Sequence, residues 1–317
     1  MAVIIVNWKV RELLCECLQS VREHSGWTPG SYEVIVVDND SGDGSVEMVR
    51  AEFPDVYLVA NTENTGFGAA NNQALALTQA ERIVLLNPDT VVLDSALARM
   101  VQALEEDPRL AIVGCKLLNK DGSLQRWTAG AFPTLANVFS HYFFLGKVLP
   151  KGMRPASLYL ESDQQGPADV DWISGACMAI RREALNGELF DRRFFMYAED
   201  MELCHRLGLA GWKVRYDPRI AIVHYQGASL QQQKAEIMLS SLKCPRHFFE
   251  ILHGRRAAAV YDRIVVVGFG LRWVLNALAG TLLSNPEFRR RAASSRNYLR
   301  LAMAVMHDAK AHAPSRG

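Results

Sequence analysis

Residues 83–90 have the sequence Ile83-Val84-Leu85-Leu86-Asn87-Pro88-Asp89-Thr90. The first four residues form a continuous apolar run, which is typical of a strand buried on both faces of a sheet. Pro88 has no amide hydrogen and ends the strand, so Asp89 follows at its carboxyl end. A carboxylate in this place is either a ligand for a hard cation or a turn residue that bonds to its own backbone.

Three further strand-like runs precede this one, and helix-like stretches separate them. The strands are expected at residues 3–6, 34–37 and 56–60, and the helices at about 9–24, 45–52 and 66–77. This alternation predicts an α/β fold with a mostly parallel central sheet. Ligands of such sheets bind beyond the carboxyl ends of the strands. The polar residues that follow the strands at this edge are Asn7, Asp38, Asn61, Asn87 and Asp89.

The second half of the chain offers two more groups that could do chemistry. Regular structure is expected at residues 170–173, 178–185, 214–216 and 221–224, with an amphipathic helix at 198–209. Glu199 and Asp200 lie in the first turn of that helix, where they either favour the positive end of the helix dipole or provide a general base. His224 closes the last strand. Its imidazole is either an ordinary core or loop histidine, or a nitrogen ligand that joins Asp89 on one metal ion.

Two loops resemble known ligand-binding signatures without matching them. Residues 38–45 are rich in acids and turn formers, but they lack the spacing and the terminal glutamate of a calcium-binding EF-hand loop. Residues 64–72 could hold phosphate at a helix N-terminus. They contain no Lys followed by Ser or Thr, and the third glycine of a dinucleotide-binding fingerprint is missing, so we expect neither a P-loop nor a Rossmann site.

Charge is distributed unevenly along the chain. The 317 residues carry a formal net charge of +1, and 49% are hydrophobic, which is enough for one large or two modest domains. From Lys243 onward, 13 Lys and Arg accompany 4 Asp and Glu, so the tail carries +9 and the preceding residues −8. We therefore expect an anionic partner for the tail. The six cysteines form no CxxC pair and no secretory signal is recognisable, which predicts reduced thiols in the cytoplasm.

A long apolar stretch lies within this basic tail. Residues 264–283 contain one charged side chain, Arg272, and a helix of this length, about 30 Å, could cross a membrane. Gly268, Arg272 and Asn276 recur every four residues and form a narrow polar stripe. Because an arginine at the bilayer centre costs at least ~2.5 kcal/mol, we expect a helix in the membrane interface or against another subunit. The alternative is a helical cap that packs on the preceding domain.

Six motifs, taken in order, closely resemble those of the family-2 inverting glycosyltransferases, in particular the rhamnosyltransferase-like branch. They are Val3-Ile4-Ile5-Val6-Asn7-Trp8, Val36-Val37-Asp38-Asn39-Asp40-Ser41, Asn64-Thr65-Gly66-Phe67-Gly68-Ala69-Ala70-Asn71, Leu86-Asn87-Pro88-Asp89-Thr90, Trp172-Ile173-Ser174-Gly175-Ala176 and Phe195-Met196-Tyr197-Ala198-Glu199-Asp200. The resemblance covers roughly residues 1–230 and implies a GT-A type fold over 1–242. Within it, about 1–115 would bind the nucleotide sugar and about 116–242 the acceptor. A basic helical region would follow at 243–317.

The resemblance also implies roles for individual residues. It implies a catalytic base in the Glu199-Asp200 pair, which we assign to Asp200, and a nucleobase contact for Asp38. The family's DxD-like metal element is Asn87-Pro88-Asp89 here, which leaves Asp89 as the carboxylate ligand of Mg²⁺ or Mn²⁺ and makes His224 an attractive second ligand. The other donor-binding residues would be Asn7, Asn39, Gly66, Asn71 and Asn87, and the acceptor-binding residues Trp172, Ser174 and Gly175.

These expectations describe a metal-dependent inverting glycosyltransferase in bacterial surface polysaccharide synthesis. Its donor would be dTDP-rhamnose or, next in order, a UDP-sugar, and its acceptor a saccharide or lipid-linked saccharide. It would act in the cytoplasm at the inner face of the plasma membrane, could form a homodimer, and would bind no nucleic acid. One alternative is a nucleotidyltransferase, although residues 10–20 lack the glycine-rich loop that such an enzyme needs. The other is a sugar-nucleotide-binding protein without turnover.

Overall fold

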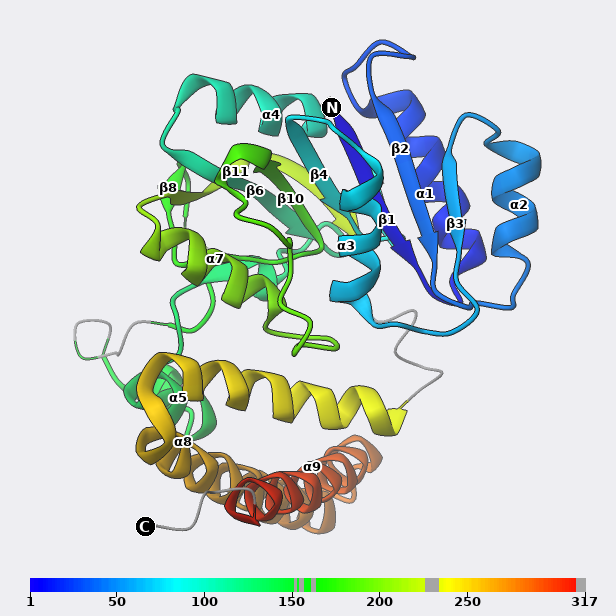
Figure 1. The fold of residues 1–317 in the computed structure, drawn as a ribbon. Coiled ribbons are helices and arrows are strands. Elements are labelled where there is room, and N and C mark those ends of the chain that lie inside the picture. The colour runs from blue at the N-terminus through cyan, green and yellow to red at the C-terminus, as the bar shows by residue number, and fades with distance from the viewer. Residues whose placement is uncertain (151–152, 154–156, 161–163, 226–233, 312–317) are drawn as a thin grey trace. The chain divides into compact units, whose positions relative to one another are not determined.

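The chain folds into two units in the computed structural model (Figure 1). The structure describes residues 1–150, 153, 157–160, 164–225 and 234–311. The first unit, the α/β unit, contains Met1–Phe132 and Tyr159–Gln233, and the second, the helical unit, contains Pro133–Leu158 and Lys234–Gly317.

A mixed sheet forms the centre of the α/β unit. Its order within the described residues is β3-β2-β1-β4-β10-β6-β11-β5, with β8 added on β11. The bounds are β1 Ala2–Asn7, β2 Glu33–Asp38, β3 Tyr57–Ala60, β4 Arg82–Leu86, β5 Thr90–Val92, β6 Leu110–Leu118, β8 Ala168–Asp169, β10 Cys177–Arg181 and β11 Lys213–His224. Strands β1, β2, β3, β4, β6 and β11 run parallel, whereas β10 is antiparallel to both of its neighbours. The predicted α/β class with a mostly parallel sheet is confirmed.

Helices cover both faces of this sheet (Figure 1). One face carries α1 (Arg11–His24), α2 (Ser45–Glu52) and α4 (Ala96–Glu106), and the other carries α3 (Phe67–Leu77) and α7 (Glu199–Leu209). Successive residues of a strand point to opposite faces, so Val3 and Ile5 enter the first core and Ile4 and Val6 the second. Burial on both faces explains why these strands are continuous apolar runs rather than alternating ones.

The structure also departs from the predicted elements. Of the strand expected at 170–173, only the second half forms a strand, β9 (Trp172–Ile173), which pairs with β7 (Ala129–Gly130), while β8 ends before it at Asp169. The predicted strands at 214–216 and 221–224 are both part of β11, whose register shifts between Asp217 and Ala221. Pro218 lies in this interval and has no amide hydrogen to give to the ladder, which accounts for the break.

The helical unit has its own core. It contains α5 (Leu135–Tyr142), α6 (Leu145–Val148), α8 (Lys234–Leu282) and α9 (Pro286–Ala311). Thr134 caps α5 by accepting from the amide of Asn137, whose side chain bonds back to the Thr134 amide. Gly254 interrupts α8 at φ 77°, a conformation that favours glycine. By length and composition, α8 contains one stretch, Ile237–Leu282, that could cross a membrane, and 17% of its apolar window is buried.

The two units divide the chain differently from the boundary expected at residue 242. Residues 234–242 belong to the helical unit, and so does the segment 133–158 from the middle of the sequence. The reason is apolar packing, because Val138 and Leu242 lie in one core with Phe249 and Val305. The basic C-terminal helices therefore do not form a unit alone.

Candidate active site

The ends of β1 and β2 bring three polar side chains together. Asn7 and Asp38 are register partners, and the Asn7 amide donates to Asp38 Oδ1 at 2.8 Å and to Ser41 Oγ at 3.1 Å. The other oxygen of Asp38 accepts the Ser41 amide hydrogen. Asn7 Oδ1 is buried and has no hydrogen-bond partner among the described residues. Since a buried oxygen without a partner is unfavourable, this acceptor is available to a bound ligand.

Asn39 holds the loop that leads into α3. Its amide nitrogen donates to Asn64 Oδ1 and to the Gly66 carbonyl, while its oxygen accepts from Asn61 and from the Thr65 backbone and hydroxyl. The side chain is 2% exposed. Asn39 therefore shapes the loop from inside and is not displayed as a free contact.

Gly66 begins α3 in a conformation that a larger residue would not tolerate. Its φ is 86°, and an added Cβ would lie 2.7 Å from the ring and 2.8 Å from the carbonyl oxygen of Phe195. Five residues later, the Asn71 amide donates to the Phe67 carbonyl inside the same helix, and Asn71 is 1% exposed. Gly66 and Asn71 are both among the residues predicted to bind donor. In the structure, Gly66 permits a close approach of two chain segments, and Asn71 stabilises the helix.

Asp89, Asn87 and His224 come together where β4 and β11 end. His224 Nε2 lies 3.2 Å from Asp89 Oδ1 and 3.4 Å from Asn87 Nδ2. The Asp89 carbonyl accepts the Tyr225 amide hydrogen, which ties the two chain segments together. Asp89 and His224 are both nearly buried, at 6% and 8% exposure. The two residues proposed from the sequence to share a metal ion are therefore adjacent in space, although they lie on segments far apart in the chain.

Gln125 completes the surroundings of His224 and was not predicted. Its amide nitrogen donates to the His224 carbonyl at 2.6 Å and to Asn119 Oδ1 at 2.9 Å. The Gln125 oxygen therefore faces His224 Nδ1, at 2.8 Å, and accepts its hydrogen. A neutral His224 then presents the Nε2 lone pair towards the Asp89 carboxylate. Two acceptors face each other, which is the arrangement that a cation between them would stabilise.

The described residues contain no group of three His, Cys, Asp or Glu side chains suited to a metal ion. Among the described residues, Asp89 and His224 are the two candidate protein ligands, and the oxygens of a bound diphosphate and water would complete the coordination. Magnesium and manganese are commonly held this way, by one or two protein groups together with substrate phosphates. The residues present fit such a cation.

Glu199 and Asp200 open α7 after a strained approach. The two preceding residues, Tyr197 and Ala198, adopt φ of 74° and 66°, which is unfavourable for residues other than glycine. Asp200 accepts the amide hydrogens of Gly175, at 3.0 Å, and Met201, at 2.8 Å. Residues held in such conformations cluster at functional sites, and these two lead directly into the acidic pair.

The two carboxylates have different surroundings. Burial raises the pKa of Asp200, and the amide hydrogens of Gly175 and Met201 oppose this shift. Burial, together with the negative charge of Asp200, raises the pKa of Glu199 well above its ordinary value. Glu199 Oε2 is buried and has no hydrogen-bond partner among the described residues. Asp200, half-buried and better hydrogen-bonded, is the group suited to accept a proton from a substrate.

The predicted acceptor residues lie beside this pair. A Cβ added at Gly175 would lie 3.4 Å from the Phe67 ring and 3.8 Å from Asp200 Cβ. Ser174 Oγ accepts the Ala176 amide hydrogen, and the Ala176 carbonyl accepts the Asn87 amide hydrogen. The 172–176 segment therefore joins the Asp200 region to the Asp89 region. Trp172 is 3% exposed and donates its indole hydrogen to the Ala131 carbonyl, so it packs beneath the site.

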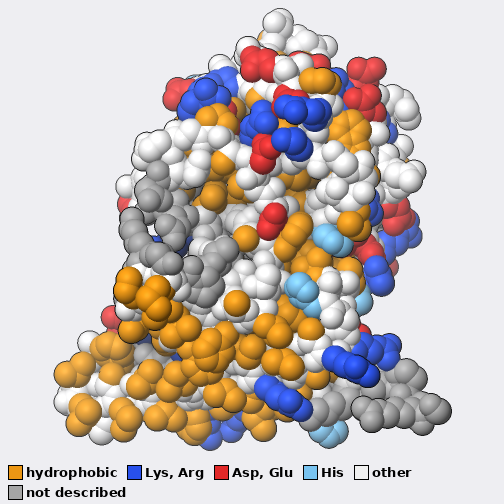
Figure 2. All heavy atoms as spheres, turned by 90° about the vertical axis from the view of Figure 1, so that its left-hand side faces the viewer, with side chains coloured by type: hydrophobic (Ala, Val, Ile, Leu, Met, Phe, Trp, Pro, Cys, Tyr) orange, Lys and Arg blue, Asp and Glu red, His pale blue; other side chains and the backbone are white. Residues whose placement is uncertain are grey.

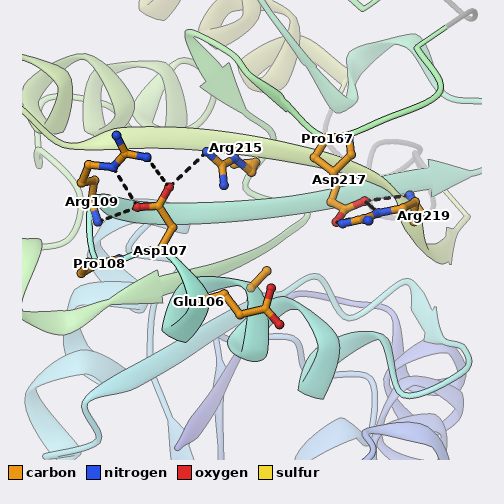
Figure 3. Close-up of a pocket in the computed structure, with 9 residues that line it drawn as sticks. Glu106, Asp107, Pro108, Arg109, Pro167, Arg215, Asp217 and Arg219 are labelled. Carbon is orange, nitrogen blue, oxygen red and sulfur yellow. Dashed lines mark hydrogen bonds and ion pairs between the residues drawn. The ribbon is translucent and has the colours of Figure 1, made fainter.

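A pocket of about 440 Å³ lies elsewhere on the α/β unit, at the end of the sheet where β6 and β11 begin (Figure 3). Asp107 pairs with Arg109 at 3.0 Å and with Arg215 at 3.3 Å, and Asp217 pairs with Arg219 at 2.6 Å. The Arg109 guanidinium holds the pKa of Asp107 well below its usual range. The charged groups pair among themselves, and none of the predicted site residues lines this pocket.

Comparison with known proteins identifies the chain. The sequence profile of Glycosyl transferase family 2 matches residues 2–187, more than half of the chain. The chain belongs to glycosyl transferase family 2. This makes it a glycosyltransferase, and the two alternatives, a nucleotidyltransferase and a non-catalytic sugar-nucleotide-binding protein, are set aside.

Relatives of this glycosyltransferase include two bacterial rhamnosyltransferases. The N-acetylglucosaminyl-diphospho-decaprenol L-rhamnosyltransferase of Mycobacterium tuberculosis is 28% identical over 239 residues, which cover 71% of this chain and 77% of that protein. Rhamnosyltransferase WbbL of Escherichia coli is 31% identical over 173 residues, 50% of this chain and 61% of that protein. The glycosyltransferase therefore resembles the rhamnosyltransferase branch, as predicted.

Solved structures show the same fold. The mannosyltransferase PcManGT from Pyrobaculum calidifontis, in complex with GDP-Man and Mn²⁺, is 20% identical and superposes with a TM-score of 0.58. The superposition covers 96% of this chain and 85% of that chain. The predicted GT-A type fold of this glycosyltransferase is thereby confirmed.

Proposed function

We propose that this glycosyltransferase moves a sugar, with rhamnose favoured, from a nucleoside-diphosphate donor to a lipid-linked saccharide, with inversion at the anomeric carbon. The observation that carries the proposal is the joining of two chemical groups by one segment: Gly175 donates to Asp200, and Ala176 accepts from Asn87 beside Asp89 and His224. The proposed proton acceptor and the proposed diphosphate-binding pair are thus connected through one short segment, residues 174–176.

The donor nucleotide would bind where β1 and β2 end. The unpartnered Asn7 Oδ1 and the Asp38 carboxylate are acceptors, either of which would suit the single imide hydrogen of a thymine or uracil ring. Asn39 and Gly66 would fix the loop against which the nucleotide lies. This chemistry fits dTDP-rhamnose and a UDP-sugar alike, and the rhamnosyltransferase relatives place dTDP-rhamnose first.

The diphosphate would lie at Asp89 and His224. A divalent cation, Mg²⁺ or Mn²⁺, held there when donor binds would supply Lewis-acid stabilisation of the charge on the leaving diphosphate. Asp89 Oδ1 and His224 Nε2 are the protein atoms that would hold it. Asn87, whose amide lies beside His224 Nε2, would restrain the histidine ring.

Asp200 would act as the base. The acceptor hydroxyl oxygen forms a bond to the anomeric carbon on the face opposite the diphosphate, and its proton passes to an oxygen of Asp200. The bond from the anomeric carbon to the diphosphate oxygen breaks, and the nucleoside diphosphate leaves with the electron pair. A base whose pKa is raised takes up the proton more readily. Ser174 and Gly175 would position the acceptor beside it.

The acceptor class rests on relatives. The name of the M. tuberculosis relative states that it transfers rhamnose to N-acetylglucosaminyl-diphospho-decaprenol. By analogy, we propose a polyprenyl-diphosphate-linked saccharide in surface polysaccharide and cell wall synthesis. Such an acceptor would place the enzyme in the cytoplasm at the inner face of the plasma membrane.

A donor screen tests the proposal directly. Purified enzyme is incubated with a polyprenyl-diphosphate N-acetylglucosamine acceptor and each of dTDP-rhamnose, UDP-glucose and GDP-mannose, and nucleoside diphosphate release is measured with and without chelator. Chelator-sensitive release that needs acceptor and is fastest with dTDP-rhamnose supports the proposal. If release is fastest with another donor, that sugar replaces rhamnose in the proposal and the transferase activity stands. If none of the three donors gives release, the proposed mechanism is contradicted.

A further inference from the structure

The second half of α8 exposes a row of apolar side chains on one side of the helix. Beyond Gly254 it exposes an aliphatic surface made of Val260, Val267, Val274, Leu278 and Leu282, which we call the apolar face. The spacing of these residues places them on one side of a helix. Leu278 is 54% exposed and Leu282 81% exposed. Figure 2 shows hydrophobic side chains gathered over this part of the molecule, with Lys and Arg side chains at their border.

The polar stripe that interrupts the apolar sequence points the other way. Gly268 lies against Tyr142, close enough that an added Cβ would be 2.7 Å from the Tyr142 Cβ. Arg272 donates to the His141 carbonyl, and its guanidinium lies over the rings of Tyr142 and Phe144. The charged residue is therefore enclosed by the protein while the aliphatic residues are exposed. In water this arrangement is unfavourable, and it is the one expected of a surface that meets lipid.

The antiparallel course of α9 decides how α8 would meet a membrane. Arg289 bonds the Gly280 carbonyl, Arg296 lies over Trp273, and the Tyr298 ring stacks on Phe269, so α9 returns along α8. Exposed arginines follow the length of α9: Arg289, Arg290, Arg291, Arg296 and Arg300. If α8 crossed a bilayer, these arginines would enter its hydrocarbon core, which is strongly unfavourable. The helix pair can bind only along the membrane plane.

We propose that the apolar face docks in the plane of an anionic lipid bilayer, with arginines at the headgroups. The charges complement such a surface, because Arg256 precedes the apolar face, Arg263 lies between Val260 and Val267, and both are exposed. Arg289, Arg290 and Arg291 provide positive charge beyond its other end. Amphipathic helices of this kind bury their apolar side at the boundary between headgroups and acyl chains.

Vesicle binding tests this docking without donor or acceptor, so the outcome does not depend on the proposed activity. Full-length protein should sediment with vesicles of phosphatidylglycerol and phosphatidylcholine at low salt, and much less with phosphatidylcholine alone. The double variant Val274→Glu/Leu278→Glu should bind at least about tenfold more weakly. Leu77→Glu is a matched control, since Leu77 is 47% exposed on the α/β unit and should leave binding unchanged.

Two results would overturn the docking: wild type that stays in solution with anionic vesicles, or a double variant that sediments as well as wild type. If wild type forms a dimer that the double variant loses, the apolar face is an interface between two copies instead. Spin labels at Val267→Cys, Val274→Cys and Leu282→Cys in a Cys15→Ser background test the orientation. The outer two labels are about 22 Å apart along the axis, so equal depths support in-plane binding and a graded depth contradicts it.

A second inference rests on separate contacts, those of Gln125. The hairpin that follows β6 carries it: Leu118 and Leu124 form a bridge, and the Gln125 amide hydrogen bonds the Leu117 carbonyl. Gln125 is 4% exposed, and both of its amide hydrogens are used by fixed acceptors, as described above. The orientation of its oxygen towards His224 Nδ1 is therefore determined by the fold.

We infer that Gln125 is a positioning residue that holds the hydrogen of neutral His224 on Nδ1, so that the Nε2 lone pair beside Asp89 can bind a cation. This deepens the proposed role of Asp89 and His224. Loss of a partner of this kind typically weakens metal binding 10–100-fold. Gln125→Glu and Gln125→Leu both lose the two amide donors, but Gln125→Glu keeps an oxygen opposite Nδ1, whereas Gln125→Leu removes this acceptor with little change of size.

The ring-nitrogen chemical shifts of His224, measured by ¹⁵N NMR in metal-free protein, test the inference independently of catalysis. We expect the Nδ1–H tautomer in wild type and in Gln125→Glu, and a mixture in Gln125→Leu. Manganese titration followed by EPR, with dTDP present, should show about 10–100-fold weaker binding in Gln125→Leu only. An unchanged tautomer in Gln125→Leu would overturn the inference. A changed tautomer with unaltered manganese binding would instead reject His224 as a ligand.

Discussion

His224 Nε2 lies 3.2 Å from Asp89 Oδ1, and both side chains are nearly buried. The first residue ends β11 and the second follows β4, and the two strands are separated in the sheet by β10 and β6. The Tyr225 amide, which donates to the Asp89 carbonyl, holds the two ends together. The pair therefore has a defined separation before any ligand arrives, which is the preorganisation that binding of a charged diphosphate needs.

Replacing Asp89 or His224 should show how the rate depends on metal binding. Asp89→Ala should weaken metal-dependent donor binding and turnover together, because the diphosphate loses its counter-charge. His224→Ala removes a proposed ligand itself, so it should raise the metal concentration needed for half-maximal rate by at least the ~10–100-fold expected for loss of an outer-shell partner, with a smaller effect at saturating metal. Rates measured against Mg²⁺ and Mn²⁺ concentration check both. Activity that persists unchanged in excess chelator would contradict the metal role of both residues.

Asp200→Asn should abolish transfer and leave donor affinity within a few-fold of wild type. The amide has the shape of the carboxylate but cannot accept the proton of the acceptor hydroxyl, so a loss of about 100- to 10,000-fold in kcat is expected. Single-turnover transfer and equilibrium binding of dTDP measure the two effects. Near-normal turnover would reject Asp200 as the base, and Glu199→Gln would then be the variant to examine.

Glu199→Gln should change how stability depends on pH. Burial and the nearby Asp200 charge raise the pKa of Glu199 in the folded protein above its unfolded value of about 4.3. Between these two values the folded state binds more protons than the unfolded state, so stability falls as pH rises. The neutral amide does not titrate. The melting temperature of Glu199→Gln minus that of wild type should therefore be larger at about pH 7.5 than at about pH 4; an equal difference would contradict the shift.

Gly66→Ala should destabilise the α/β unit by about 2–4 kcal/mol. The added methyl group would be strained at φ 86° and would meet the carbonyl oxygen of Phe195 at 2.8 Å, a backbone atom that cannot turn away. Gly42→Ala provides the matched control, because Gly42 also has positive φ, 62°, but nothing lies within 4 Å of its added Cβ. It should lose only about 1–2 kcal/mol, from strain alone. Urea unfolding of both variants measures the difference, and equal losses would exclude a role for the Phe195 contact.

The sequence predicts the parts of the site that depend on local pattern. The buried strands before Asn7, Asp38 and Asp89 appear as apolar runs, and the edge at which their carboxyl ends meet follows from parallel pairing. No local pattern predicts that Gln125 lies beside His224, because its position depends on a hairpin that closes onto the end of β11. The antiparallel direction of β10 is likewise invisible, since a strand buried on both faces has the same apolar composition in either direction.

Strand β10 also has a consequence for how the chain is made. It lies between β4 and β6, and the neighbours of β6 among the described strands, β10 and β11, both come later in the sequence. As the protein emerges from the ribosome, residues 110–118 therefore lack both of these partner strands until residue 181 has been synthesised. The apolar edge of β4 stays unpaired during the same interval. During this interval the nascent chain therefore depends on chaperones or on rapid synthesis of the remaining strands. A fragment that ends near residue 118 should aggregate rather than fold.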